Sequence, residues 1–263
     1  MTRPTLAGIL EATRERVATL RPKARQLERA AAAAPPGPEL DSAFRGATVG
    51  VIGEVKRRSP SAGAIREDLD PVAHARAYVR GGASAISVLT DEKHFGGAVE
   101  DLGRVARAVP VPALCKDFIL DVLQLLEARA AGASGALLIV RALAPDRLRA
   151  LAREAKGLGL GTLIEAHSEA ELDAAVAAEP TAVGVNSRDL DTFTVDLSVA
   201  ERLLPLVPAG LPAVGESGVE TRADVERLAA CGADLVLVGT AVARAADPEG
   251  AVRALCGVLR RPR

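Results

Sequence analysis

The feature that most constrains the fold is an alternation of short apolar segments with segments of helical periodicity. Eight apolar runs of four to eight residues predict buried strands: Thr48–Val55, Ala85–Leu89, Pro112–Cys115, Ala136–Val140, Thr162–Glu165, Ala182–Val185, Pro212–Gly215 and Leu235–Val238. Eight helical segments lie between and after them: Val72–Val79, Val99–Val109, Val122–Ala131, Pro145–Leu158, Glu169–Ala178, Val199–Leu204, Arg222–Ala230 and Glu249–Leu259.

The continuous apolar character of the runs indicates parallel strands that are covered on both faces. Eight such units in roughly 215 residues predict an α/β fold of the closed (β/α)8 type, a TIM barrel. A doubly wound sheet is the alternative, but it usually needs fewer strands, and no Gly-x-Gly-x-x-Gly follows the first run. Glycines support the division into units, because Gly82, Gly132, Gly159 and Gly232 each follow a helical segment and can take the left-handed conformation that closes a helix.

Residues 1–47 precede the first predicted strand. Five apolar residues share one helical face: Leu6, Ile9, Leu10, Val17 and Leu20. Residues 30–34, followed by Pro-Pro-Gly-Pro at 35–38, predict a helix end and a linker. We expect residues 1–47 to form an additional helix packed on a barrel of residues 48–263, all within one domain; a loosely attached tail is the alternative.

Charge and composition exclude several classes of protein. The 33 Lys and Arg against 34 Asp and Glu give a net charge of −1, so no basic field attracts nucleic acid. No apolar run reaches the ~20 residues of a membrane span, and the first residues become charged too soon for a signal peptide. The three cysteines lack metal-ligand spacing and would leave one unpaired in any disulfide scheme. We expect a reduced, cytoplasmic protein without nucleic-acid or membrane partners, as a monomer or a weak homodimer.

Polar and charged residues follow the predicted strands at their carboxyl ends, where barrel enzymes build their active sites. They are Glu54, Lys56, Thr90, Asp91, Lys116, Asp117, Glu165, Asn186, Arg188, Glu216 and Ser217. Glu54 and Lys56 are two residues apart on one strand and therefore share a face. A charge in a strand needs a partner, so six strands that end in this way predict a catalytic site rather than solvated loop ends.

Two glycine-containing turns follow the last two predicted strands. Ser217-Gly218 and Gly239-Thr240 each lie between a strand and a helical segment. Glycine permits close approach to a ligand, and backbone N–H groups at a helix start bind anions. In many barrels this is the phosphate site, so the sequence predicts a phosphorylated small-molecule substrate.

The polar motifs also resemble a known family. Residues 54–63 resemble the E-x-K-x-x-S-P-S-x-G signature of the indole-3-glycerol phosphate synthases, which close the indole ring in tryptophan biosynthesis. Further blocks are similar and collinear: residues 87–90, 95–97, 116–119, 137–140, 163–165, 184–190 and 216–219. The resemblance covers about residues 48–245. It departs at Cys115, at Val122-Leu123 and at Thr240, where Arg, Pro-Tyr and Glu are frequent in the family.

The resemblance implies a decarboxylating and dehydrating ring closure of 1-(2-carboxyphenylamino)-1-deoxyribulose 5-phosphate. The ring carbon that bears the carboxylate attacks the ribulose carbonyl, and CO2 and water then leave. This reaction, that of a carboxy-lyase, needs no cofactor and no metal. His74, His94 and His167 are accordingly interpreted as surface or packing residues rather than ligands.

The resemblance also implies roles. Lys116 is expected to be the general acid and Glu165 the general base, and Lys56, supported by Glu54, holds the carboxylate or acts as a second acid. The remaining catalytic candidates are Asn186 and Glu216. The substrate-binding candidates are Ser59, Pro60, Phe95, Phe118, Arg188, Leu190, Ser217, Gly218, Leu237, Gly239 and Thr240.

Two kinds of substrate contact and the pKa of Lys116 can be argued further from the residue types. Phe95 and Phe118 are expected to sandwich the aryl ring, with ordinary core packing as the alternative. Arg188 is expected to bind the substrate carboxylate, with a salt bridge to Asp189 or Asp191 as the alternative. Burial and Lys56 should lower the pKa of Lys116 while the carboxylates raise it, which leaves the net direction open.

Other functions remain open at this point. A phosphoribosyl isomerase would carry acid–base Asp or Cys at strand ends where this chain has Glu54 and Asn186. A barrel that senses a phosphorylated metabolite would have lost Lys116 or Glu165. A paralogue that serves secondary metabolism would share every motif.

Overall fold

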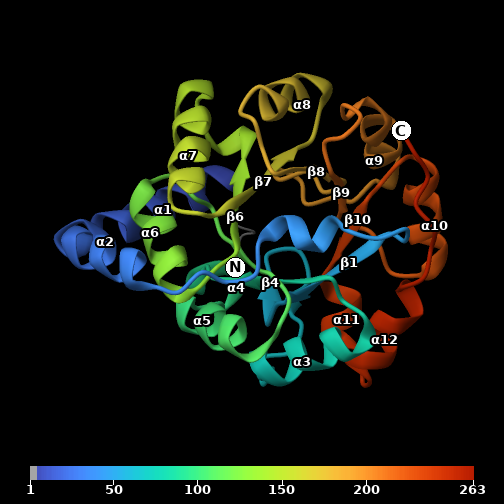
Figure 1. Cartoon of the computed structure of the whole chain (residues 1–263), viewed down its shortest axis with the longest axis horizontal. Coiled ribbons are helices and arrows are strands. Elements are labelled where there is room, and N and C mark those ends of the chain that lie inside the picture. The colour runs from blue at the N-terminus through green and yellow to red at the C-terminus, as the bar shows by residue number, and fades with distance from the viewer. Residues whose placement is uncertain (1–4) are drawn as a thin grey trace.

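The computed structural model describes residues 5–263, which form a closed barrel of parallel strands surrounded by helices (Figure 1). The eight barrel strands are β1 (Gly50–Val55), β4 (Ala85–Leu89), β5 (Ala113–Lys116), β6 (Gly135–Ile139), β7 (Gly161–Ala166), β8 (Ala182–Asn186), β9 (Ala213–Glu216) and β10 (Leu235–Val238). Each strand pairs with the next along the chain, and β1 pairs with β10, with Gly50 opposite Leu235, to close the barrel. The predicted (β/α)8 fold is confirmed.

The helices that follow the strands also match the prediction, with differences at their ends. They are α3 (Pro71–Gly81), α5 (Val99–Ala108), α6 (Val122–Ala131), α7 (Pro145–Gly157), α8 (Glu169–Val176), α9 (Leu197–Leu203), α10 (Arg222–Ala230) and α12 (Pro248–Leu255). Gly82 and Gly132 cap α3 and α6 in the left-handed conformation, with φ of 105° and 93°. The last predicted helix is four residues too long, because the chain leaves α12 after Leu255 and Leu259 pairs with Thr48.

Short elements inside the loops were not predicted. A hairpin of β2 (Arg58–Ser59) and β3 (Gly63–Ala64) follows β1, and α4 (Glu92–Phe95) follows β4. A third short element, α11 (Thr240–Arg244), follows β10. All three lie beyond the carboxyl ends of strands, on the side where a barrel binds its substrate.

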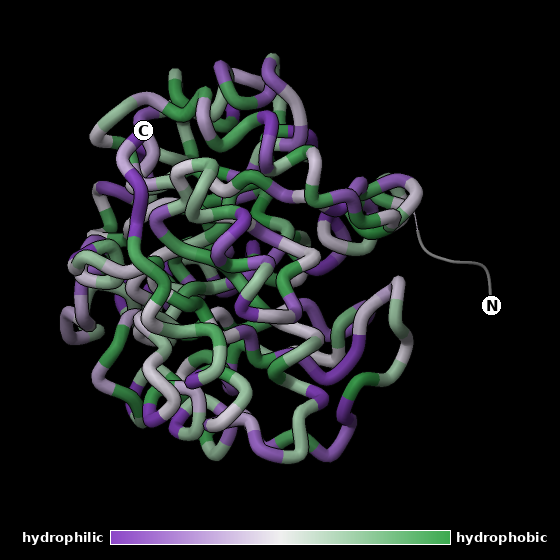
Figure 2. Tube along the Cα trace, turned by 90° about the vertical axis from the view of Figure 1, so that its right-hand side faces the viewer, coloured by the Kyte–Doolittle hydropathy of each residue, from purple (hydrophilic) through white to green (hydrophobic). Residues whose placement is uncertain are grey.

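Two sets of buried side chains form the core. Residues such as Leu102, Leu151 and Val236 fill the layer between the strands and the helices. The inside of the barrel is filled by Ile52, Leu114, Leu137, Leu163, Val214 and Leu235. Figure 2 shows apolar segments running through the inside of the molecule, whereas hydrophilic residues concentrate at peripheral turns.

The segment that precedes the barrel contains two helices instead of the single one expected. These are α1 (Leu6–Leu20) and α2 (Ala24–Ala33), joined by a 3₁₀ turn at Arg21–Lys23. Pro22 has no N–H to continue the α-helical hydrogen bonds and so separates them. The five predicted apolar residues of α1 are buried, and Ala31 of α2 packs with Leu123 and Leu126 of α6. Figure 1 shows α1 and α2 beside α6. Helices α1 and α2 therefore both contact α6.

A membrane-spanning helix would be long and continuously apolar. Among the helices of residues 5–263, none has the length and hydropathy to cross a membrane.

Candidate active site

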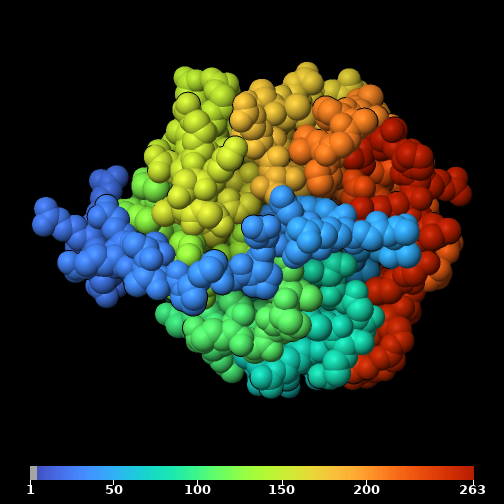
Figure 3. Space-filling view, in the orientation of Figure 1, coloured from blue at the N-terminus to red at the C-terminus, as the bar shows by residue number. Residues whose placement is uncertain are grey.

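A cavity of about 370 Å³ opens at the carboxyl ends of the barrel strands. All of the catalytic and substrate-binding residues predicted from the sequence line it. The segment after β1, drawn in lighter blue in Figure 3, lies across this face of the molecule and reaches the C-terminal quarter, where Arg66 Nη1 donates to the Ala245 carbonyl at 3.3 Å. The barrel strands thus form the floor of the cavity, and this segment covers part of its opening.

Lys116 lies between two buried carboxylates on the cavity floor. Its Nζ is 3.5 Å from Glu165 Oε2 and 3.6 Å from Glu216 Oε2. Both glutamates are only 1% exposed. Their positions follow from the parallel register, because β5, β7 and β9 end at the same edge of the barrel.

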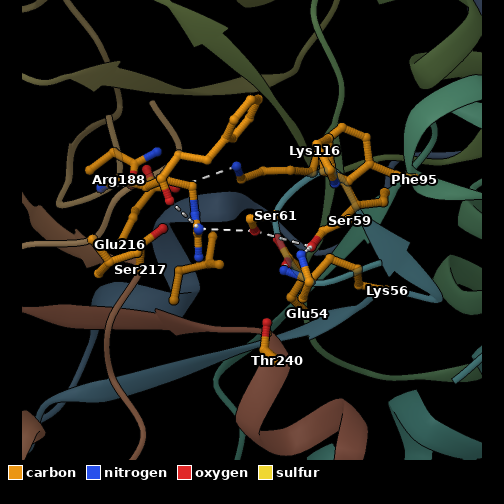
Figure 4. Close-up of a pocket in the computed structure, with 18 of the residues that line it drawn as sticks. Glu54, Lys56, Ser59, Ser61, Phe95, Lys116, Arg188, Glu216, Ser217 and Thr240 are labelled. Carbon is orange, nitrogen blue, oxygen red and sulfur yellow. Dashed lines mark hydrogen bonds and ion pairs between the residues drawn. The ribbon is translucent and has the colours of Figure 1, made fainter. Parts of the chain in front are cut away.

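A second ion pair lies beside this group. Lys56 Nζ is 2.6 Å from Glu54 Oε1, so the two residues do share a face as expected (Figure 4). Burial alone would raise the pKa of Glu54, but the Lys56 and Lys116 ammonium groups lower it overall. Gly239 packs against this pair, and a Cβ at that position would overlap Glu54 Oε1.

Carboxylates decide the protonation of Lys116. Burial would lower its pKa, but Glu165, Glu216 and Glu54 together raise it above the usual value. The sequence left the direction of the Lys116 pKa shift open, and in the structure the pKa is raised. Lys116 carries a proton at neutral pH.

The two glutamates beside Lys116 have opposite pKa shifts. Burial and the neighbouring Glu165 raise the pKa of Glu216 to about 8. Burial also opposes ionisation of Glu165, but Lys116, His167 and the Asn186 amide hold the pKa of Glu165 well below its usual range. At neutral pH Glu165 is a carboxylate and most of Glu216 is a neutral acid.

Arg188 points into the cavity from the loop after β8. Its Nη1 donates to Ser61 Oγ at 3.0 Å and to the Phe193 carbonyl at 3.1 Å (Figure 4). Burial lowers the pKa of Arg188, and Glu54 opposes this effect. Asp189 and Asp191 pair with Arg141 instead, at 3.4 Å and 3.7 Å. The alternative of a loop-tying salt bridge between Arg188 and either aspartate is wrong.

The aromatic residues of the cavity contact one another. The ring centroids of Phe95 and Phe118 are 6.3 Å apart and their planes are inclined by 37°. Rings in this arrangement pack against each other, so the free cavity lies beside the pair and not between the two rings. A third ring, Phe193, also lines the cavity and has a left-handed backbone conformation with φ of 58°.

The two predicted phosphate turns differ in conformation. Gly239 is the N-cap of α11, so this turn opens a helix as expected. Ser217 and Gly218 both have left-handed φ, 63° and 83°, and α10 begins only at Arg222. The Ser217-Gly218 turn thus lies between a strand and a helix as predicted, but residues 219–221 separate it from the helix. Successive left-handed residues instead turn the backbone around the cavity rim.

Several residues around the site were not predicted. Ser61, Phe193 and Val195 line the cavity as well, and so does Asp91, which was predicted only as a strand-end residue. Asp117 lies behind Lys116, where it accepts hydrogen bonds from Thr90 Oγ1 at 2.8 Å and from Arg16 of α1 at 3.1 Å. No pattern in the sequence connects Arg16 to Asp117, because the two residues are 101 positions apart.

His167 lies behind Glu165 and was interpreted only as a surface or packing residue. Its Nε2 is 3.3 Å from Glu165 Oε1, and its Nδ1 is 3.0 Å from Glu171 Oε2. The signal in the sequence was weak, because β7 ends at Ala166 and His167 follows the strand that carries Glu165. As for metals, residues 5–263 hold no group of three or more His, Cys, Asp or Glu side chains arranged to bind an ion.

Comparisons with known proteins agree on one family. A family model described as indole-3-glycerol phosphate synthase matches residues 6–255. "Indole-3-glycerol phosphate synthase 2" of Streptomyces coelicolor is 45% identical over 255 residues, which are 96% of this chain and 98% of that protein. "Indole-3-glycerol phosphate synthase" of a Nocardioides species is 51% identical over 215 residues, which are 82% of this chain and 83% of that protein.

Solved structures with low sequence identity share the architecture. A 3-hexulose-6-phosphate synthase from Salmonella typhimurium superposes with a TM-score of 0.62 at 16% identity, over 79% of this chain and 96% of that one. A thiamine phosphate pyrophosphorylase from Pyrococcus furiosus superposes with a TM-score of 0.60 at 18% identity, over 82% of this chain and 96% of that one. At these identities the likeness shows the fold alone.

Proposed function

The chain belongs to the indole-3-glycerol phosphate synthase family, and we propose from this premise how its cavity closes the indole ring. The protein is a carboxy-lyase of tryptophan biosynthesis that acts on a phosphorylated substrate, 1-(2-carboxyphenylamino)-1-deoxyribulose 5-phosphate. The observation that carries the proposal is the position of Lys116 Nζ between Glu165 and Glu216 on the floor of the cavity. One cation and two carboxyl groups of different pKa provide an acid and a base within one small volume.

Lys116 is the general acid of the condensation step. When the aryl carbon attacks the ribulose carbonyl, negative charge develops on the carbonyl oxygen and needs a proton donor. The raised pKa of Lys116 supports this role, since the side chain remains an ammonium group at neutral pH. The raised pKa also favours stabilisation of the oxyanion by a charged hydrogen bond before the proton moves.

Glu165 is the general base of the steps that follow. Loss of CO2 and water and recovery of the aromatic ring require removal of a proton. Glu165 is ionised at neutral pH, as a base must be, whereas Glu216 keeps its proton and can give it to the departing hydroxyl group. The two carboxyl groups thus have different roles because their surroundings separate their pKa values.

The other cavity residues bind and orient the substrate. The Ser217-Gly218 and Gly239-Thr240 turns, which both line the cavity, bind the phosphate. The substrate carboxylate lies near Lys56 and Arg188, with Glu54 and Asn186 holding these groups in place. The aryl ring packs against the Phe95 and Phe118 pair and not between them. Four further residues complete the wall: Ser59, Pro60, Leu190 and Leu237.

The decisive experiment is turnover of the substrate, followed by indole absorbance or fluorescence. Lys116→Met nearly preserves side-chain length while deleting the charge, and Glu165→Gln deletes the base at nearly constant shape. Because a positioned acid or base contributes about 10²–10⁴-fold in rate, each variant should lose at least about 10²-fold in kcat. If either folded variant retains more than about a tenth of the parental kcat, its assignment is wrong and Lys56 is the next candidate.

A crystal soaked in product tests the phosphate position. Electron density for the phosphate away from residues 217–218 and 239–240 would refute that part of the proposal. The same turnover assay separates the alternatives, because an isomerase or a metabolite sensor would form no indole. Assays in a strain that lacks its own synthase distinguish a primary enzyme from a paralogue of secondary metabolism.

We also propose the wider properties of the protein. Residues 1–47 and 48–263 act as one domain, which is supported by the Arg16–Asp117 ion pair between them. The protein acts in the cytoplasm without a cofactor or metal, and its partner is its small-molecule substrate and neither nucleic acid nor a membrane. The balanced net charge of −1 supports the absence of a nucleic-acid partner. Light scattering after size exclusion tests whether it is a monomer or a weak homodimer.

A further inference from the structure

Glu165 and Glu216 are almost equivalent with respect to Lys116. They lie 3.5 Å and 3.6 Å from its Nζ, and both are 1% exposed. A buried acid beside a single cation can be either ionised or protonated, and two such acids beside one cation compete for the ionised state. Something other than Lys116 must determine which of the two is the carboxylate.

The difference between them lies on the side away from Lys116. Glu165 Oε1 faces the His167 ring, with Nε2 at 3.3 Å. Within residues 5–263, neither carboxyl oxygen of Glu216 has a hydrogen-bond partner, whereas Glu165 Oε2 accepts one from Lys116. The contact between Glu165 Oε1 and His167 is an ion pair and not a hydrogen bond. Gly184 of β8 faces Glu216, and a Cβ there would overlap Glu216 Oε1, so this side offers space but no charge. Among the described residues, Glu165 therefore has a charged ring in direct contact behind it, and Glu216 has no such contact.

The His167 ring is itself held in a fixed orientation. Its Nδ1 is 3.0 Å from Glu171 Oε2, and the same oxygen accepts the backbone N–H of His167 at 2.9 Å. The other oxygen of Glu171 accepts a hydrogen bond from Arg141 Nε at 3.0 Å. The ring has little room to turn, because its side chain is 4% exposed. A continuous row of charged groups thus runs from Arg141 to the base.

The charges around the ring favour its protonated form. The titratable groups that face it are Glu165 on β7 and Glu171 on α8, with Glu216 on β9, Lys116 on β5 and Arg141 one residue further away. A neutral imidazole has one N–H and would leave one of the two adjacent carboxylates facing a lone pair. Burial opposes protonation, but Glu165 and Glu171 raise the pKa of His167 to about 9.

We propose that His167, held by Glu171, is the positioning residue that makes Glu165, rather than Glu216, the ionised carboxylate beside Lys116. This inference rests on the proposed role of Glu165 as the base. His167 touches neither the cavity nor the substrate and acts through Glu165. Without it, the one negative charge is distributed over both glutamates, so fewer molecules have the base ionised and the Glu216 acid protonated at the same time.

Two variants test the proposal. His167→Gln keeps a buried amide that can hydrogen-bond Glu165 but removes the positive charge. Glu171→Gln leaves the ring in place and removes the charge that holds it protonated. His74→Gln is the matched control, because His74 is also a buried histidine but contacts Asp70 and Tyr78 and no carboxylate of the cavity.

The first measurement is the pH profile of turnover. In both variants kcat at pH 7 should fall by about tenfold or more, part of the about 10²–10⁴-fold that a base supplies. The acidic limb of the profile should move to higher pH, because loss of a nearby cation raises the pKa of the base. KM should stay within about twofold of the parent, and His74→Gln should match the parent in every respect.

The second measurement needs no turnover. The chain has three histidines, so the ring-nitrogen NMR signals of His167 are those that disappear in His167→Gln. In the parent at pH 7 both ring nitrogens of His167 should carry a proton, and Glu171→Gln should lower the pH at which one proton is lost. If His167→Gln fails to fold, Glu171→Gln supplies both measurements, and the signals of His167 are then those whose pH of proton loss changes in Glu171→Gln.

The outcomes separate the two proposals. A neutral His167 ring in the parent at pH 7 overturns this inference. It is also overturned if both variants have the same kcat as the parent and the same acidic limb in the pH profile. If those results accompany an inactive Glu165→Gln variant, only the inference about His167 is wrong. If Glu165→Gln is active, the proposed base is wrong, and the inference falls with it whatever the ring signals show.

Discussion

Glu216 on the floor of the cavity and His167 behind it both carry protons at neutral pH that they would mostly have lost in the unfolded chain. Glu216 keeps a proton to about pH 8, and His167 keeps one to about pH 9. Both values lie above those of the unfolded chain, about 4.5 and 6.5. The folded state therefore binds these protons more tightly than the unfolded state, which links the stability of the protein to pH.

The sign of this effect can be tested at His167. A folded pKa above the unfolded one gives stability that is fully present below pH 6.5 and is lost as the pH rises through about 9. The free energy of unfolding should thus decrease between pH 6.5 and 9, as measured by urea denaturation. His167→Gln should reduce this decrease and His74→Gln should not. Equal pH slopes in the parent and in His167→Gln would show that the ring does not gain its proton on folding.

Arg188 offers a test of substrate recognition. Its guanidinium group already binds Ser61 and Phe193 and faces the cavity. Since a charged hydrogen bond contributes about 1.5–3 kcal/mol, Arg188→Ala should weaken binding of the substrate relative to an analogue without the carboxylate by about 10- to 150-fold. Arg188→Lys keeps the charge but loses the planar guanidinium group, so its preference for the substrate over the analogue should lie between those of the parent and of Arg188→Ala. An unchanged ratio between the two ligands in Arg188→Ala would contradict the role.

For individual site residues, the sequence predicted which side chains come together but not how each changes the pKa of its neighbours. A charge at the end of a buried strand is costly unless it is paired. This cost made three residues recognisable as site candidates: Lys56, Lys116 and Glu165. The upward pKa of Lys116 was not predictable, because it depends on distances of about 3.5 Å to carboxylates on other strands. His167 was missed because its function depends on Glu171, which belongs to the following helix.

Helix α1 is the element that connects the N-terminal segment to the site. Its Arg16 donates to Asp117 Oδ2 at 3.1 Å and also pairs with Glu127 of α6. Asp117 directly follows Lys116 and is buried, and burial raises its pKa despite the presence of Arg16. Loss of Arg16 would leave this buried acid without its cation.

We expect Arg16→Met to lower both stability and turnover. Removing one partner of a buried pair costs about 3–5 kcal/mol, and the partial exposure of Arg16 reduces this to about 1–3 kcal/mol. The melting temperature should fall by about 2–10 °C, and kcat should fall because Asp117 adjoins the acid. Arg14→Met is the matched control, since Arg14 lies on the same helix in an exposed pair with Glu11. Equal melting temperatures for the two variants would show that Arg16 is unimportant.

The large elements were predictable and the small ones were not. A strand covered on both faces must be apolar throughout, so β4 and β10 have the predicted bounds. The hairpin of β2 and β3 has two-residue strands, and α4 has one turn. Arg58 joins them by donating to the carbonyls of Glu92 and Lys93. Elements this short exist because of contacts between distant loops, which leave no periodic pattern in the sequence.

For the molecule as a whole, ligand binding and stability are coupled. Residues of all eight barrel strands line the cavity, so a ligand in it lies against the entire barrel. A ligand at 100 times its Kd stabilises the folded state by about 2.7 kcal/mol. Indole-3-glycerol phosphate at that concentration should raise the melting temperature by about 5–10 °C.

The comparison that tests the phosphate site uses the same ligand without its phosphate. Indole-3-glycerol at the same concentration should produce a much smaller increase in melting temperature, because it lacks the group that the turns at residues 217–218 and 239–240 would bind. Equal increases for the two compounds would mean that the phosphate contributes little to binding and that these turns have another role.

Closure of the barrel between β1 and β10 has a consequence for how the protein is made. The partners of residues 50–53 are residues 235–238, and the ladder continues where Val49 N–H donates to the Val258 carbonyl. A ribosome that adds about 5–20 residues per second needs roughly 10–40 s to synthesise the intervening chain. During that time β1 has an unpaired edge and can pair only with β4. The barrel can close only after β10 and residue 258 have left the ribosome. The contact between Glu54 on β1 and Gly239 beyond β10 forms at the same time.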